Sequence, residues 1–384
     1  MMSRLINRRG ILLLGGVVLL AGCKVIPKGA PEPTPEPSAP PTSTLPADQQ
    51  RHRVALLVPL SGANAGVGNS IANATTMALL DTNAQNLRIT TYDTALGVTL
   101  AANQAISDGN KLILGPLQGA DVTAVTAIAR TAKVPLITYA NDQAVAARDV
   151  FLLGTVPGNA IGRTVRHAYA QGARRFAVLA PQSDFGQRTS AAYAEAVRLS
   201  GGTLVASESY TRTNTSVISA ASRLRARGGV DAVLIADDAR FAALAAPNLK
   251  AAGAAAPRIL GPDTWSGESV IGSTPALRGA WYAAVSDARF RQFADSYNTR
   301  FGARPFRVAT LGYDSVLLTM RVARDWRPGT VFPVSKLNDS GGFLGLDGPF
   351  RFNNAGMLER ALEVREVRAG GVTIVSPAPT KFQD

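Results

Sequence analysis

Polar side chains that follow predicted strands give this 384-residue chain a candidate site for a small molecule. The polar side chains of Ser61, Thr138, Tyr139 and Asn141, with nearby backbone N–H groups, could bind a carboxylate group. Asp238 or Asp263 could bind an ammonium group. Because the carboxyl ends of parallel strands meet at one sheet edge, we expect these loops to line a common cleft. The candidate residues are Ser61, Gly62, Thr138, Tyr139, Asn141, Phe185, Asp238 and Asp263.

The same residue types are also common in turns and at helix N-termini. Asp237 and Asp238, for example, directly precede a predicted helix and could cap it with their carboxylates. Both interpretations remain open from the sequence alone.

Catalytic patterns are scarce. The chain has only two histidines, His52 and His167, which gives little material for a His-based triad or a metal cluster. It has no Gly-x-Ser-x-Gly motif, and no lysine has a serine three residues before it. A carboxylate pair that cleaves glycosides stays possible, although no residue indicates one. We therefore predict no enzyme activity, no catalytic residue, no cofactor and no bound metal.

The glycines of Gly66-Val67-Gly68 are expected to let the chain turn tightly into a helix. A dinucleotide-binding fingerprint would need glycine at position 71, where Ile71 stands, and no phosphate-binding Gly-Lys-Ser sequence occurs. A weak anion cradle at the start of this helix is the alternative.

The N-terminus has the pattern of an export signal. Three arginines in the first nine residues precede an apolar run over residues 11–20, too short for a stable membrane span. Leu20-Ala21-Gly22-Cys23 resembles a bacterial lipobox, which implies cleavage before Cys23 and lipidation of that residue. Cys23 is the single cysteine, so no disulfide forms within the chain. The alternative is an ordinary cleaved signal followed by a chance cysteine.

Residues 27–46 contain eight prolines among polar and small residues. Such a segment buries too little apolar surface to fold and favours extended polyproline II, so we predict a semi-rigid spacer. A Pro-rich ligand for a partner protein is the alternative. The formal net charge of +13 favours anionic surroundings, such as lipid head groups or an acidic protein face. An export signal and the absence of a basic-aromatic stripe argue against nucleic acid.

From residue 53 onward, apolar strands alternate with amphipathic helices. Buried strands are predicted near 54–58, 87–92, 111–114 and 134–138, each followed by turn residues and a helix. The pattern restarts after residue 157 with strands near 176–180, 203–207, 232–236 and 258–261. This alternation predicts an α/β protein with two successive doubly wound units. Short segments of alternating polarity at 345–352 and 361–367 predict antiparallel strands in the C-terminal part of the sequence.

The chain resembles the type 1 periplasmic binding proteins, which include the Leu/Ile/Val-binding proteins. The resemblance rests on residues 54–69, on Leu114-Gly115-Pro116-Leu117 and on Gly312-Tyr313-Asp314-Ser315. It implies two Rossmann-like lobes joined by three crossovers, expected near 154–158, 283–288 and 327–334. The expected division is a signal peptide at 1–22, lipidated Cys23 and linker at 23–50, lobe 1 at 51–156 plus 286–328, and lobe 2 at 157–285 plus 329–384.

A narrower resemblance lies in the tail. Residues 345–353, then Glu359-Arg360 and Gly370-Gly371, resemble the branch called penicillin-binding protein activators, outer-membrane lipoproteins that stimulate peptidoglycan synthases. Lys24 after the lipidated cysteine also favours the outer membrane. The implied partners are the membrane, through Cys23, and a penicillin-binding protein.

The alternatives are a substrate-binding lipoprotein of an ABC transporter for an amino acid or similar solute, and, less favoured, an envelope enzyme. This chain has Thr138-Tyr139-Ala140 where the binding family often has Ser-x-Thr, which disfavours an amino acid as ligand.

Overall fold

The computed structural model describes residues 50–250 and 256–382, all of which belong to one compact unit, Leu45–Asp384. The predicted signal peptide, Cys23 and the Pro-rich linker lie outside the described residues. None of the helices in the described part of the chain combines the length and the apolar character needed to span a bilayer.

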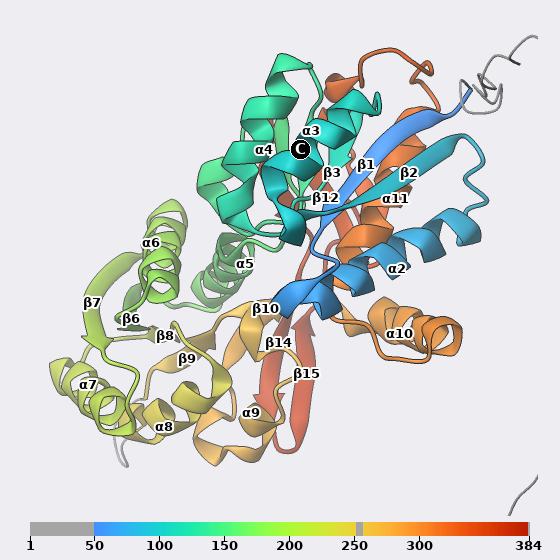
Figure 1. Ribbon diagram of the computed structural model, residues 1–384. Coiled ribbons are helices and arrows are strands. Elements are labelled where there is room, and N and C mark those ends of the chain that lie inside the picture. Colours follow the sequence, from blue (N-terminus) through green and yellow to red (C-terminus); the bar gives the residue numbers. More distant parts are fainter. Residues whose placement is uncertain (1–49, 251–255, 383–384) are drawn as a thin grey trace, which may run out of the picture. The chain divides into compact units, whose positions relative to one another are not determined.

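The first lobe is built on a five-stranded parallel sheet with strand order β2-β1-β3-β4-β5 (Figure 1). The strands are β1 (His52–Val58), β2 (Leu87–Asp93), β3 (Leu112–Leu114), β4 (Leu136–Thr138) and β5 (Val150–Leu152). The helices are α2 (Ala65–Asp81), α3 (Val98–Ser107), α4 (Gly119–Thr131), α10 (Asp287–Phe301) and α11 (Ala309–Ala323).

Both faces of this sheet are covered, which explains why its central strands are continuous apolar runs. On β1, Val54 and Leu56 pack in a core with α2 and α11, whereas Ala55 and Leu57 pack in a second core with α3 and α4. The two-residue period of a strand therefore divides one apolar run between two helix layers.

The second lobe is built on a seven-stranded sheet with strand order β15-β14-β10-β9-β8-β6-β7. Its parallel strands are β6 (Arg175–Pro181), β7 (Thr203–Tyr210), β8 (Ala232–Ile235), β9 (Arg258–Gly261) and β10 (Trp281–Ala284), and β14 (Glu363–Arg368) and β15 (Gly371–Ser376) complete it in antiparallel fashion. The helices are α5 (Pro157–Ala170), α6 (Asp184–Leu199), α7 (Asn214–Arg227), α8 (Ala239–Leu249) and α9 (Ser269–Ser273). Helices α5 and α6 pack on one face of the sheet, and α7 and α8 pack on the other.

A third, three-stranded antiparallel sheet lies in the tail: β11 (Phe343–Gly345), β12 (Gly348–Phe352) and β13 (Leu358–Arg360). Its residues Phe343, Phe350 and Phe352 are buried in the same core as β1 and α11. The tail up to residue 360 thus packs with the first lobe and not with the second lobe, which the sequence predicts for residues 329–384.

The connections between the lobes follow from this packing. The chain passes from β5 to α5 through residues 153–156, which begin one residue before the predicted segment, and from β10 to α10 through residues 285–286, which lie inside the predicted segment. The third passage, from β13 to β14, lies at residues 361–362. The predicted position at 327–334 is wrong, because the aromatic side chains of β11 and β12 hold this part of the tail on the first lobe. The α/β fold with two doubly wound lobes is otherwise as predicted.

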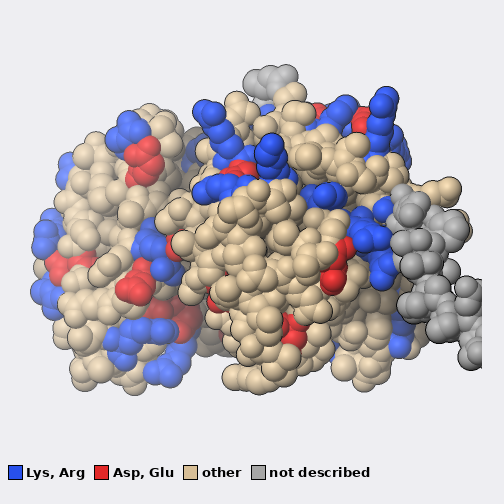
Figure 2. Space-filling model, turned by 45° about the horizontal axis from the view of Figure 1, so that its top comes forward, with Lys and Arg blue, Asp and Glu red and all other residues tan. Residues whose placement is uncertain are grey.

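Basic and acidic side chains are interspersed on the surface. On the face shown in Figure 2, Lys and Arg form several separate groups with Asp and Glu among them, and no single basic stripe runs across it. Many of the basic groups have internal partners; Arg223 and Arg227, for instance, both form ion pairs with Glu208.

Candidate functional site

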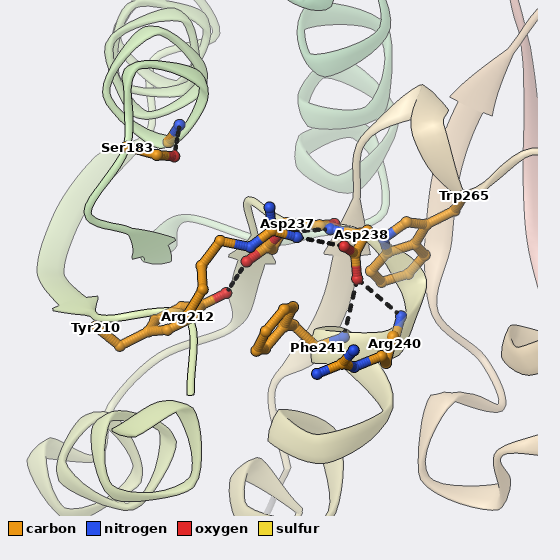
Figure 3. Close-up of polar contacts among 9 residues, drawn as sticks. Ser183, Tyr210, Arg212, Asp237, Asp238, Arg240, Phe241 and Trp265 are labelled. Carbon is orange, nitrogen blue, oxygen red and sulfur yellow. Dashed lines mark hydrogen bonds and ion pairs between the residues drawn. The ribbon is translucent and has the colours of Figure 1, made fainter. Parts of the chain in front are cut away.

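A polar cluster occupies the carboxyl edge of the second lobe's sheet (Figure 3). The Tyr210 hydroxyl, at the end of β7, donates a hydrogen bond to Asp237 Oδ2 over 2.6 Å. Arg212 forms an ion pair with Asp237 Oδ1 at 3.0 Å and a second one with Asp238. Burial raises the pKa of Asp237, and its contacts with Tyr210 and Arg212 oppose that rise. The hydrogen-bonding groups and charges of these four side chains are therefore paired with one another.

Asp238 acts as the N-cap of α8. Its Oδ1 accepts the backbone N–H groups of Arg240 and Phe241, both at 3.1 Å. Trp265 is fully buried beside it and donates its indole N–H to the Asp237 carbonyl oxygen over 2.9 Å. For Asp238 the structure supports the capping interpretation over the ligand-binding one.

The candidate residues on the first lobe's sheet edge also have internal partners. Ser61 donates to Asp93 Oδ2 over 2.7 Å, and the buried Thr138 donates to the Pro116 carbonyl oxygen over 2.8 Å. The pKa of Asp93 is lowered, first by its hydrogen bond from the Leu60 N–H and then by that from Ser61. Gly62 has a φ of +70°, which lets the chain turn directly after Ser61.

A cavity of about 680 Å³ is lined by residues of both lobes. Of the predicted residues, Tyr139, Asn141 and Asp263 line it, whereas Ser61, Gly62, Thr138, Phe185 and Asp238 do not. The Tyr139 hydroxyl shares a 2.9 Å hydrogen bond with Ser315 Oγ, and burial raises the pKa of Tyr139. Burial also raises the pKa of Asp263. Tyr139 and Asn141 belong to the first lobe and Asp263 to the second, so the predicted residues that line the cavity lie on both lobes.

A second groove, of about 810 Å³, lies between α5, α6 and residues 141–144. Its walls include small and apolar residues such as Ala192, Ala196 and Leu199. Asn141 lines both spaces, so they open close to each other.

The inner charged residues of the 680 Å³ cavity were missed by the sequence analysis. Arg307 forms a 2.6 Å ion pair with Asp347 Oδ1, and Thr310 donates to Asp347 Oδ2 over 2.8 Å. Arg360 also lines the cavity, and its closest carboxylate oxygen is Asp314 Oδ2, at 3.7 Å from Nη1. One feature of the sequence could have indicated Arg360. It is a charged residue at a strand position that pairs with the buried Phe350, where an apolar residue is normally expected.

The buried Asp314 carboxyl has an unusual protonation equilibrium. Burial, followed by the charge of Asp347, raises its pKa to about 7, while Arg360 and the Leu346 N–H oppose the rise. Because this pKa is above that of an exposed aspartate, the folded protein holds the proton more tightly than the unfolded chain does.

We expect this group to make the protein less stable as pH rises. Its contribution is fully present below pH 3.8, the unfolded value, and is lost as pH rises through about 7. Asp314→Asn cannot titrate, so raising the pH from 5 to 8 should lower the free energy of unfolding more in the wild type than in this variant. Urea denaturation at both pH values measures the difference. Equal pH dependence of the two proteins would contradict the assignment.

Each of the two histidines packs against a tryptophan side chain. His52 stacks on Trp326 with ring centroids 4.1 Å apart, and His167 meets Trp281 edge to face at 4.7 Å. Burial lowers the pKa of both. Within residues 50–250 and 256–382, no group of three or more His, Cys, Asp or Glu side chains is arranged to hold a metal ion.

Two doubly wound lobes, three connections and a cavity lined by both lobes define a bilobed binding protein. The family model for "Periplasmic binding protein" matches residues 52–372, and the chain belongs to this family. The type 1 class inferred from the sequence is therefore confirmed.

Solved structures share this fold at low sequence identity. A protein from Rhodospirillum rubrum assigned to branched-chain amino acid ABC transport is 22% identical, with a TM-score of 0.76 over 85% of this chain and 100% of that chain. A branched-chain amino acid ABC transporter ligand-binding protein from Burkholderia xenovorans is 16% identical, with a TM-score of 0.66 over 86% of this chain and 96% of that chain. At these identities the similarity establishes the fold alone.

Two curated proteins match a shorter part of the chain. An uncharacterized protein of Rickettsia prowazekii is 28% identical over 145 residues, which are 37% of this chain and 39% of that protein. The penicillin-binding protein activator LpoA of Photobacterium profundum is 28% identical over 151 residues, 38% of this chain and 24% of that protein. The match thus spans less than two-fifths of either relative.

Proposed function

We propose that this protein is a non-catalytic lipoprotein of the Gram-negative envelope that activates a peptidoglycan synthase. The partial similarity to LpoA supports this function. The predicted lipid anchor at Cys23 and the predicted spacer at 27–46 are consistent with it, because together they would hold the folded unit away from the outer membrane and toward a synthase in the inner one.

One observation carries the choice of activation over transport. Ser61 and Thr138, expected to bind a ligand carboxylate, donate instead to Asp93 and to Pro116. Asp238, expected to bind an ammonium group, caps α8 and pairs with Arg212. A binding protein for amino acids needs its polar groups directed at the ligand. Three of the six groups expected for that role have internal partners instead, which favours a role that depends on the surface.

The test is a reconstituted polymerisation assay. The full chain is added to a glycosyltransferase–transpeptidase penicillin-binding protein of the same organism, and the rate of glycan polymerisation from lipid-linked precursor is measured. We expect the rate to rise several-fold and the two proteins to co-purify. A transport-type periplasmic binding protein is the control. An unchanged rate together with no co-purification, across the synthases of that organism, contradicts the proposal.

The second candidate is a substrate-binding lipoprotein of an ABC transporter, which the 680 Å³ cavity favours. Asp263 is placed to receive a ligand's ammonium group, with Tyr139 and Asn141 on the opposite lobe. A thermal-shift screen with leucine, isoleucine and valine tests it, since a ligand that binds only the folded state raises the melting temperature. A large rise of the melting temperature at micromolar amino acid would favour the transport function over synthase activation.

The lipid anchor gives a prediction of its own. Cys23→Ala removes the thiol that would be acylated and leaves the folded unit unchanged. We expect the wild type in the outer-membrane fraction and the variant in the soluble periplasmic or uncleaved fraction, with equal melting temperatures. Outer-membrane retention of a mature Cys23→Ala protein would argue against lipidation at this position.

A further inference from the structure

Strand β15 forms one edge of the second lobe's sheet and carries exposed apolar side chains. Its neighbour in the sheet is β14, and it is the outermost strand on that side (Figure 1). Val372 is 41% exposed, Ile374 52% and Val375 36%. The strand contains no charged residue. Because an edge strand presents unpaired backbone groups, an uncharged and apolar one is a template for pairing with another chain.

The other edges of the two large sheets carry the usual protection against such pairing. At the opposite edge of the same sheet, β7 contains Glu208, which is held by Arg223 and Arg227. In the first lobe's sheet, the edge strand β2 contains Arg88 and Asp93, and β5 is only three residues long. Charges and short length both discourage edge-to-edge pairing. Of these four described edges, β15 is therefore the one suited to association.

The backbone of β14 shows which groups of β15 face outward. The Val367 N–H donates to the Ala280 carbonyl oxygen over 2.9 Å, and the Val367 carbonyl oxygen accepts the Gly279 N–H over 2.8 Å. Both backbone groups of Val367 thus face away from β15. Since successive residues of a strand direct their backbone groups to opposite sides, those of Glu366 and Arg368 face β15.

The register between the two strands carries this alternation to the edge. Thr373 lies opposite Glu366, so the backbone groups of Thr373 face β14. The N–H and C=O groups of Val372 and Ile374 therefore point away from the sheet. Among the described residues, neither has a backbone hydrogen bond outside the strand ladders. The two residues with free backbone groups are also the two most exposed apolar residues of the strand.

The sequence around Thr373 matches a second copy of the same strand. In an antiparallel pair with its two-fold axis at Thr373, Val372 lies opposite Ile374 of the second copy, and each such pair can exchange both of its N–H···O bonds. Val372 and Ile374 project to one face of the sheet, so the axis brings the four apolar side chains together. Thr373 lies opposite Thr373 of the second copy. Apolar pairs and Thr–Thr pairs stabilise a sheet, and no like charges meet.

We propose that this protein forms a two-fold dimer in which the β15 strands of two copies pair antiparallel about Thr373 and join their sheets into one. The self-matching pattern and the lack of charge on the strand favour a second copy over a different protein. A pair of six-residue strands is smaller than the standard stable interface of about 1,600 Å². We therefore expect weak association, in the micromolar range or above. The inference goes beyond synthase activation, because it requires no synthase.

The first experiment measures the oligomeric state of the full chain by analytical ultracentrifugation. The concentration series runs from about 1 µM to about 0.5 mM, which covers the affinity expected of a small interface. We expect a reversible monomer–dimer equilibrium for the wild type. Ile374→Lys should weaken it about tenfold or more, because two ammonium groups would enter the apolar cluster. Val372→Pro should weaken it too, since it removes an outward N–H and keeps the ladder to β14.

A matched control adds the same charge elsewhere. Ile218 lies on α7 and is 37% exposed, so Ile218→Lys should dimerise like the wild type. Melting temperatures close to the wild-type value confirm that each variant is folded. A wild type that stays monomeric throughout the series overturns the proposal. So does equal weakening in Ile218→Lys, or a wild type that forms species larger than a dimer.

The second experiment tests the register with introduced cysteines. In chains that also carry Cys23→Ala, Thr373→Cys would place two cysteine Cα atoms about 4.5 Å apart across the axis, within the range of a disulfide. Gly371→Cys is the control, because four residues of strand would separate the two thiols by about 13 Å. Oxidation with glutathione disulfide should cross-link the first variant and not the second. Equal cross-linking of both, or of neither, contradicts the two-fold pairing at Thr373.

These outcomes are distinguishable from failure of the proposed activation. Loss of the dimer in Ile374→Lys with normal stimulation of a synthase supports both statements separately. A monomeric wild type whose stimulation of a synthase is abolished by Ile374→Lys would assign this edge to the synthase and contradict the dimer.

Discussion

Arg365→Met should lower the free energy of unfolding by about 3–5 kcal/mol, because removing one partner of a buried ion pair leaves the other uncompensated. The Arg365 side chain is 4% exposed and forms ion pairs of 2.7 Å with both Glu363 and Asp287. It also donates to the Val285 carbonyl oxygen over 2.7 Å. These contacts tie β14 to the passage between β10 and α10, so the variant would weaken the junction of the two lobes.

A matched control lies on the same strand. Arg368 pairs with Glu366 at 2.8 Å, but its side chain is 61% exposed. Since exposed ion pairs contribute about 0–1 kcal/mol, Arg368→Met should change the free energy of unfolding by no more than that. Urea denaturation followed by circular dichroism measures both variants. Similar losses in the two would show that burial of the Arg365 pairs does not matter.

Gly68→Ala should lower the free energy of unfolding by about 3 kcal/mol or more, at or above the upper end of ordinary overpacking. A Cβ at this position would lie 1.7 Å from the Pro59 carbonyl oxygen, so either the start of α2 or the end of β1 must move. Thermal or urea unfolding of the purified variant tests the expectation.

Gly66→Ala is the control for that substitution. Its Cβ would meet the Phe306 ring at 3.4 Å, an ordinary contact. Because alanine is the better helix former by about 1 kcal/mol, this variant should be as stable as the wild type or slightly more so. If Gly68→Ala proves equally harmless, the close approach to Pro59 is not a constraint.

These glycines also show where local sequence patterns mislead. They were expected in a loop that turns into the helix, but α2 begins at Ala65, so both lie inside it. Gly68 is required by a neighbour, the carbonyl of Pro59, and not by the local turn. Spacing between glycines cannot distinguish these two causes.

The strands and their order along the chain were predictable because burial on both faces leaves apolar runs such as 54–58 and 232–236. The position of the third lobe connection was not predictable, because it depends on where Phe350 and Phe352 pack. The alternating pattern of β12 shows that one of its faces is buried, but not against which lobe. Long-range packing of this kind leaves no local signal.

The candidate site was only partly predictable for a similar reason. Position after a strand end selected Tyr139, Asn141 and Asp263, which line the cavity. It failed for Ser61 and Thr138, whose partners Asp93 and Pro116 belong to neighbouring strand ends. Arg360 was missed because an arginine in a strand is normally exposed, and its nearest carboxylate, Asp314 on α11, is distant in the sequence.

The late position of the third connection has a consequence for truncated forms of the chain. The first lobe's core needs Phe343 to Leu358, and the second lobe's sheet needs β14 and β15. Both lobes therefore depend on residues after position 342 to complete their buried surfaces, so a chain truncated before that residue should leave apolar surface exposed on both lobes.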